Sequence, residues 1–125
     1  MMEFTTRESV LAIEAQGAWN TLDVAKSIYQ LLSRTKAAHG AKAAVSFQLT
    51  SGPKDRAETL SWNALHGRVT QAANLFRSLG VGEKDVVAYV LPNSMETVVT
   101  LFGGAVAGIV APINPLMELD QIAAI

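Results

Sequence analysis

The sequence contains no cysteine, which excludes disulfides, thiolate metal sites and a thiol nucleophile. Charge is scarce and balanced: 17% of the residues are charged, and Asp and Glu exceed Lys and Arg by one, for a net charge of -1. Nucleic-acid binding depends on clustered cations that neutralise phosphates, and this balance does not supply them. A chain without cysteine is compatible with a reducing compartment, and we predict a cytoplasmic protein.

No secretory signal is predicted, because four charged residues interrupt the first 20 positions. One charge-free run, residues 97–117, is long enough to cross a bilayer. It contains Gly104-x-x-x-Gly108, a spacing that lets membrane helices approach closely. Pro112 and Pro115 lie in the same run, however, and favour a buried helix followed by a buried strand. A segment anchored in a membrane through 97–117 remains a second alternative.

The hydrophobic half of the sequence is spaced as alternating helices and strands. Apolar residues three or four apart predict helices from Asn20 or Thr21 to Gly40, from Ser61 to Gly80, and over 94–107. Runs rich in β-prone or apolar residues predict strands at 43–49, 59–62, 86–91 and 109–113, and a further helix is expected from Glu118 onward.

Two details of this pattern make specific predictions. The run at 86–91 is apolar without interruption, which is typical of a strand buried on both faces. Asn93 is followed three residues later by Glu96, and this spacing predicts that Asn93 caps the next helix.

Strands that alternate with helices indicate the α/β class. We predict a mixed, largely parallel sheet flanked by helices, with one antiparallel hairpin formed by 43–49 and 59–62. Residues 1–19 show weak periodicity and are expected to be a weakly ordered lead-in. Residues 20–125 are expected to form the α/β unit, which ends in an unfinished helix and is therefore predicted to be incomplete.

The stretch "LTSGPKDRAET" at 49–59 has Thr, Ser, Gly and Lys close together, a composition similar to that of a phosphate-binding loop. A Walker loop, however, joins a strand to a helix and ends in Gly-Lys-Ser or Gly-Lys-Thr. Here Lys54 is followed by the acidic Asp55, and the segment after the loop is β-prone. We predict a surface turn in which Gly52 and Pro53 supply the bend.

Other candidate sites are equally weak. Gly80-x-Gly82 follows a predicted helix instead of opening one, so it is interpreted as a helix end and not as a dinucleotide fingerprint. His39 and His66 have no partner at metal-ligand spacing, and His66 is predicted to be a partly exposed side chain. Ser94 lacks the context of a nucleophile elbow. Residue chemistry therefore assigns no catalytic, cofactor-binding or metal-binding residue.

Three segments nevertheless resemble one family, in matching order. "TLSWNAL" at 59–65 is similar to the first core motif of the adenylate-forming acyl-CoA synthetases (AMP-dependent synthetases and ligases), and "GGAVAGIVAPINP" at 103–115 is similar to the second. "LGVGEKDVVAYVLPNSMET" matches the segment between them, although Lys84 stands where the family commonly has glycine. The resemblance covers about the last two-thirds of the chain.

This resemblance implies an enzyme that activates a carboxylic acid with ATP to an acyl-adenylate and passes the acyl group to coenzyme A, as in fatty acid metabolism. ATP, Mg²⁺ and coenzyme A are implied for the full-length enzyme. The family's phosphate loop follows the second motif, whereas "TSGPK" precedes the first, so no phosphate-binding role is assigned to Ser51, Gly52 or Lys54.

The resemblance thus predicts an N-terminal fragment, with residues 20–125 as an incomplete N-terminal subdomain that serves as scaffold without the catalytic loops. The 125-residue chain alone is predicted to be inactive. Its partner would be the remainder of its own polypeptide, and the isolated fragment is expected to self-associate through exposed apolar surface. The first alternative is a complete small α/β domain for binding or assembly.

Overall fold

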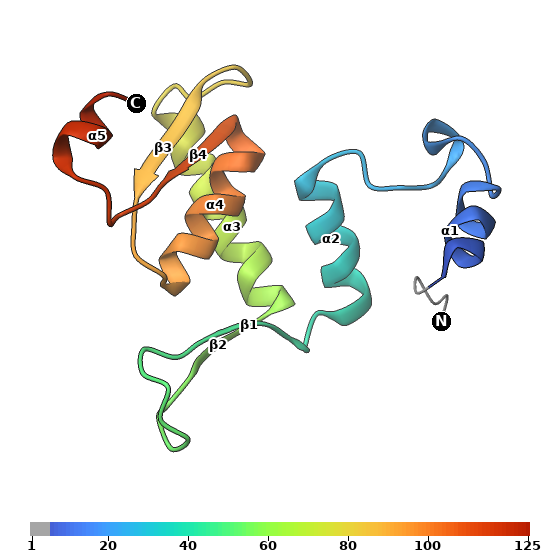
Figure 1. Cartoon of the computed structure of the whole chain (residues 1–125), viewed down its shortest axis with the longest axis horizontal. Helices are drawn as coiled ribbons and strands as arrows, with labels where there is room; N and C mark the ends of the chain where they lie inside the picture. Colours follow the sequence, from blue (N-terminus) through green and yellow to red (C-terminus); the bar gives the residue numbers. More distant parts are fainter. Residues whose placement is uncertain (1–5) are drawn as a thin grey trace.

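The structure is a computed structural model that describes residues 6–125. Its helices are α1 (Arg7–Glu14), the 3-10 helix η1 (Trp19–Thr21), α2 (Ile28–His39), α3 (Trp62–Ser78), α4 (Met95–Ala107) and α5 (Leu119–Ala123). Its strands are β1 (Ala43–Phe47), β2 (Glu58–Ser61), β3 (Val86–Val90) and β4 (Ile109–Ile113). Figure 1 shows α3 and α4 side by side in the middle of the molecule, with the β3–β4 pair over α4.

The strands confirm the α/β class and both predicted kinds of pairing. β1 pairs antiparallel with β2, with Val45 opposite Leu60, and β3 pairs parallel with β4, with Val86 opposite Ile109. The two pairs form separate two-stranded sheets and do not join into one larger sheet. β1 contacts α3 and α4 instead of β3, so helices lie between the hairpin and the parallel pair.

The helix predicted from residue 20 or 21 begins later, at Ile28. Ser27 has an extended backbone, and its hydroxyl accepts the backbone N–H of Gln30 at 3.1 Å, which makes it the true cap. Residues before it are tied to the helix differently, through an ion pair of 2.8 Å between Asp23 and Arg34. The helical spacing of Leu22 and Ala25 was therefore misleading, because neither lies in a helix.

A second cap was wrong by one position. Ser94, not Asn93, is the cap of α4, and its hydroxyl accepts the backbone N–H of Thr97 at 3.2 Å. Both residue types cap helices well, so composition alone does not choose between neighbours. The predicted ends of α2 at Gly40 and of α3 near Gly80 are confirmed, and Gly80 has the positive φ of 93° that suits glycine.

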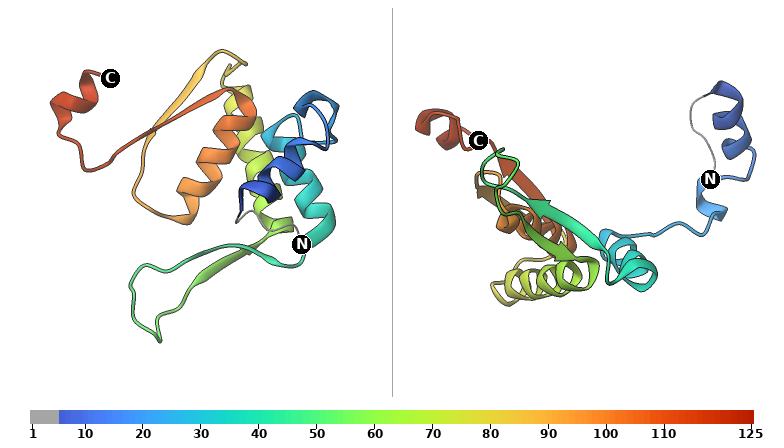
Figure 2. Two further views of the ribbon diagram at one scale, coloured as in Figure 1. Left: turned by 45° about the vertical axis from the view of Figure 1, so that its right-hand side comes forward. Right: turned by 90° about the horizontal axis from the view of Figure 1, so that it is seen from below.

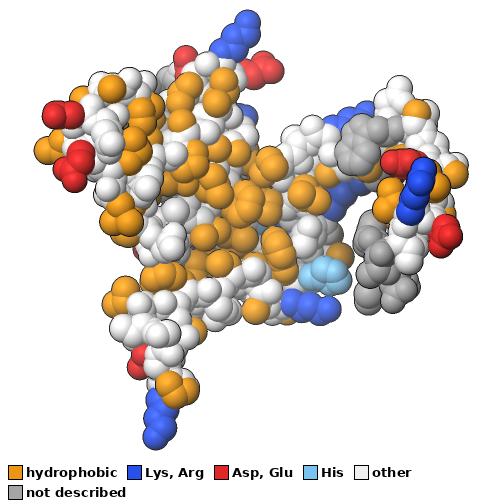
Figure 3. Space-filling view, viewed as in Figure 1, with side chains coloured by type: hydrophobic (Ala, Val, Ile, Leu, Met, Phe, Trp, Pro, Cys, Tyr) orange, Lys and Arg blue, Asp and Glu red, His pale blue; other side chains and the backbone are white. Residues whose placement is uncertain are grey.

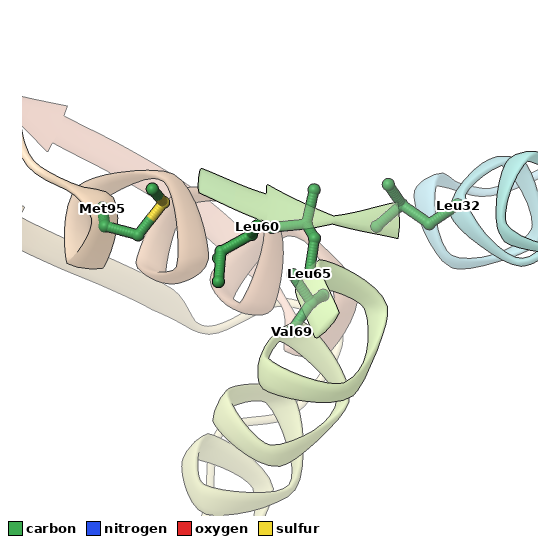
Figure 4. Packing of buried hydrophobic residues seen from close by; sticks show 5 residues of the cluster. All are labelled: Leu32, Leu60, Leu65, Val69 and Met95. Carbon is green, nitrogen blue, oxygen red and sulfur yellow. The ribbon is translucent and has the colours of Figure 1, made fainter. Parts of the chain in front are cut away.

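The main core joins four elements. It consists of Leu32 from α2, Leu60 from β2, Leu65 and Val69 from α3, and Met95 from α4 (Figure 4). Val69 is completely buried, and Leu65 and Met95 are nearly so. β2 runs directly into α3, so Leu60 and Leu65 lie on the two sides of this junction. Both side chains lie in the same core (Figure 4).

The glycines of the charge-free run are used inside the fold. A Cβ atom at Gly103 would lie 2.7 Å from the Cβ of Ala72, so glycine allows α4 to approach α3 closely. A Cβ at Gly104 would lie 3.1 Å from Val110, on the side of α4 that packs against the β3–β4 pair. The run from 97 to 117 is divided between α4 and β4, and among the described residues no helix has the length and apolarity to cross a membrane.

The prediction that the 86–91 strand is buried on both faces is wrong. Val87 is 9% exposed and lies against α4, whereas Val86 and Val90 on the opposite face are 55% and 43% exposed. Successive residues of a strand point to opposite faces, so β3 has one covered face and one open face. No second layer of helices covers the open face in the described part of the chain.

The described part of the lead-in includes α1, whose cap Thr6 accepts the backbone N–H of Ser9 at 3.2 Å. None of the α1 residues is buried. Figures 1 and 2 show this segment, in blue, extending away from the helices and strands of 28–113. The proposed boundary between residues 19 and 20 stays a prediction.

Candidate functional site

The loop between β1 and β2 is closed by its own carboxylate. Asp55 accepts the backbone N–H of Gly52 at 2.9 Å and a hydrogen bond from the Thr50 hydroxyl. The Gln48 side-chain amide donates to the carbonyl oxygens of Gly52 and Asp55 from across the loop, at 2.8 and 3.0 Å. The predicted hairpin turn is confirmed.

This arrangement does not suit a phosphate. An anion held by a loop needs free N–H and hydroxyl donors, and the Asp55 carboxylate already occupies the donors of Thr50 and Gly52. A phosphate at this position would also lie against a negative side chain. The likeness of "TSGPK" to a phosphate loop is therefore one of composition, and the residues do not fit the phosphates of ATP.

The turn at 79–85 is also closed by an Asp carboxylate that accepts a glycine N–H three residues earlier. Asp85 accepts the backbone N–H of Gly82 at 2.8 Å, and its own N–H donates to the Gly82 carbonyl oxygen at 3.1 Å. The turn closes α3 and leads into β3, as predicted for a helix end. Gly108 lies tightly under this turn, since a Cβ there would come within 2.6 Å of the Asp85 carbonyl oxygen.

His66 belongs to a small polar cluster between α2 and α3. Its Nε2 lies 3.0 Å from the Ser33 hydroxyl, and its ring centroid lies 5.0 Å from that of Tyr29. The hydroxyl of Ser33 donates its single proton to the Tyr29 carbonyl oxygen at 2.8 Å. His66 Nε2 must then be the donor to Ser33, which is the opposite of what a general base needs. The Ser–His pair joins two helices and does not activate a nucleophile.

Burial, with a smaller contribution from the nearby Lys36 ammonium, lowers the pKa of His66 below its ordinary value of 6.5. The side chain is partly buried, in agreement with the prediction from its place at the border of the apolar stripe. Sequence reasoning did not find Tyr29 or Ser33 as its neighbours. They come from another helix, and nothing in the local spacing of α3 points to them.

A groove of about 380 Å³ lies beside this cluster, where the start of α2 meets α3 and α4. Tyr29, Thr70 and Val106 contribute to its lining, and Arg77 crosses its end. The Arg77 guanidinium donates to the Val106 carbonyl oxygen at 3.2 Å, which ties α3 to α4. The groove continues past Arg77 along the turn at Gly82. Its lining mixes apolar side chains with the polar Ser27, Thr70 and Asn74 and the cation of Arg77, and the part along the turn adds the single carboxylate of Glu83.

Among the described residues, no group of three or more His, Asp or Glu side chains is placed to hold a metal ion. His39 lies in the last turn of α2, and His66 lies in α3. The absence of assigned catalytic, cofactor-binding and metal-binding residues remains a prediction.

Comparison with protein families gives one match: residues 32–125 fit the family model described as "AMP-binding enzyme". The matched range includes the described strands, the described helices from α3 onward and residues 32–39 of α2.

Among the curated proteins similar to this chain are two enzymes that use coenzyme A. The marinolic acid–CoA ligase of a Pseudoalteromonas species is 39% identical over 77 residues, which cover 58% of this chain and 12% of that protein. The acetyl-coenzyme A synthetase of Thiobacillus denitrificans is 40% identical over 73 residues, or 58% of this chain and 11% of that protein. The chain thus spans only about a tenth of the length of these relatives.

A solved structure has the same fold. The fatty acid AMP ligase from Legionella pneumophila superposes with a TM-score of 0.69 at 18% identity, covering 79% of this chain and 17% of that one. At this level of identity the likeness concerns the fold alone.

Proposed function

Because this chain belongs to the AMP-binding enzyme family, we propose that it forms the N-terminal scaffold of an ATP-dependent acid–CoA ligase. The observation that carries the proposal is the family match over 32–125, together with the similarity to a marinolic acid–CoA ligase and an acetyl-coenzyme A synthetase. The complete enzyme would act in the cytoplasm, on a carboxylic acid of the kind used in fatty acid metabolism.

The proposed reaction explains why a large enzyme is needed. A carboxylate is a poor electrophile, and transfer to AMP gives it a leaving group that the thiol of coenzyme A can displace. ATP would supply the adenylate, and Mg²⁺ would offset the charge of its phosphates. No described residue is assigned to hold these groups, because the one loop with a suitable composition is closed by Asp55. Those contacts would come from other parts of a longer polypeptide.

The proposed contribution of this chain is therefore structural support. The core of Leu65, Val69 and Met95 and the close contact of Gly103 with Ala72 fix α3 against α4. α4 in turn holds the parallel pair, since Gly104 lies against Val87 and Val110. In open α/β sheets, ligands bind beyond the carboxyl ends of parallel strands. By fixing the position of β3 and β4, this chain would help to set where the ligand-binding edge of the complete enzyme's sheet lies.

A chimera tests this role. Residues 32–125 would replace the corresponding segment of the acetyl-coenzyme A synthetase from Thiobacillus denitrificans. We expect acetyl-CoA formation within about tenfold of the parent enzyme, equal to about 1.4 kcal/mol in the barrier. A matched chimera with Gly103→Leu, which forces α3 and α4 apart, should lose activity. A correctly folded but inactive first chimera would contradict the proposal.

The isolated chain gives a second test. We expect no pyrophosphate release from ATP in the presence of a panel of carboxylic acids and coenzyme A, with the parent synthetase as the positive control. Release that depends on both ATP and an acid would show that the catalytic groups lie within these 125 residues, and the scaffold role would be wrong.

A further inference from the structure

We draw no further inference here: the strongest candidate, the apolar face of the β3–β4 pair that points away from α4 (the open sheet face: Val86, Ala88 and Val90 of β3 with Ile109, Ala111 and Ile113 of β4, where Figure 3 shows hydrophobic side chains gathered), carries no proposal because nothing in the structure shows what covers it.

Discussion

The two sides of α4 are built from similar residues and yet differ in kind. On one side, Gly103 meets Ala72 of α3, and the neighbouring core residues Leu65 and Val69 are at most 2% exposed. On the other side, α4 covers one face of the β3–β4 pair, and the opposite face remains about half exposed. The contact between α4 and α3 is therefore part of a buried core. The parallel pair is covered by α4 on one face and exposed on the other. The difference shows that apolar composition alone does not say which surfaces of a chain are closed.

The largest expected effect on the free energy of unfolding comes from truncation of a buried leucine. Leu65→Ala removes a side chain that is 2% exposed and leaves a cavity, so we expect a loss of about 3 kcal/mol in the free energy of unfolding. Val86→Ala on the open sheet face should cost less than about 0.5 kcal/mol in the monomer. Urea unfolding at low concentration measures both. Equal losses would remove the distinction between the two sides.

A pair of glycine substitutions sharpens the same contrast within helices. Gly103→Ala places a Cβ 2.7 Å from Ala72, and overpacking should destabilise the protein by about 2 kcal/mol. Gly67→Ala in α3 makes the identical change where no atom lies within 4 Å, and it should stabilise by about 0.5–1 kcal/mol. Thermal unfolding of the two variants should therefore shift in opposite directions. A stabilising Gly103→Ala would disprove the close contact.

The start of α4 is tested by its cap. Ser94→Ala removes the acceptor for the Thr97 N–H and should cost about 1 kcal/mol. Asn93→Ala should change the free energy of unfolding by less than about 0.5 kcal/mol, because Asn93 lies outside the helix. If urea unfolding showed a larger loss of stability for Asn93→Ala than for Ser94→Ala, Asn93 would be the cap, as the sequence predicted.

The smallest expected effect is a pH dependence at the contact between α2 and α3. The pKa of His66 is lowered in the folded protein, so the unfolded chain binds a proton first as the pH falls. Stability from this group is fully present above pH 6.5, its ordinary pKa, and is lost as the pH falls through the folded value. We expect a slightly larger drop in melting temperature from pH 7.5 to 5.5 for the wild type than for His66→Gln.

His66→Gln retains an N–H donor toward Ser33, and His39 is present in both proteins, so the difference isolates the titration of His66. Glu96 also has a lowered pKa, because its own backbone N–H and the Ser94 hydroxyl donate to it, but it titrates below this pH range. Identical pH profiles of the two proteins would show that protonation of His66 does not affect the contact.

Much of this fold follows from local sequence. The spacing of Leu65 and Val69 predicts α3, Gly52 and Pro53 predict the hairpin turn, and each is confirmed. Errors arose where two local choices were equally good. Ser94 and Asn93 both favour capping, and Leu22 continues the stripe of α2 although the helix begins only at Ile28.

The candidate site was less accessible from sequence. The rejection of "TSGPK" as a phosphate loop rested on order along the chain, and the reason visible in space is the Asp55 carboxylate, which takes the Gly52 N–H. The partners of His66 were not foreseen, because Tyr29 and Ser33 reach it from another helix. Contacts between elements depend on how helices dock, and periodicity within one element does not contain that information.

The sequence by itself determined the order and type of the elements, since periodicity, caps and turn residues act over a few positions. It also determined the family, because motifs in a fixed order survive as sequence. Only the tertiary structure decided which apolar surfaces are closed. Val87 and Val86 are chemically identical neighbours, yet one lies under α4 and the other on the open sheet face. Burial is set by what packs on each face of the strand, and that is a property of the whole fold.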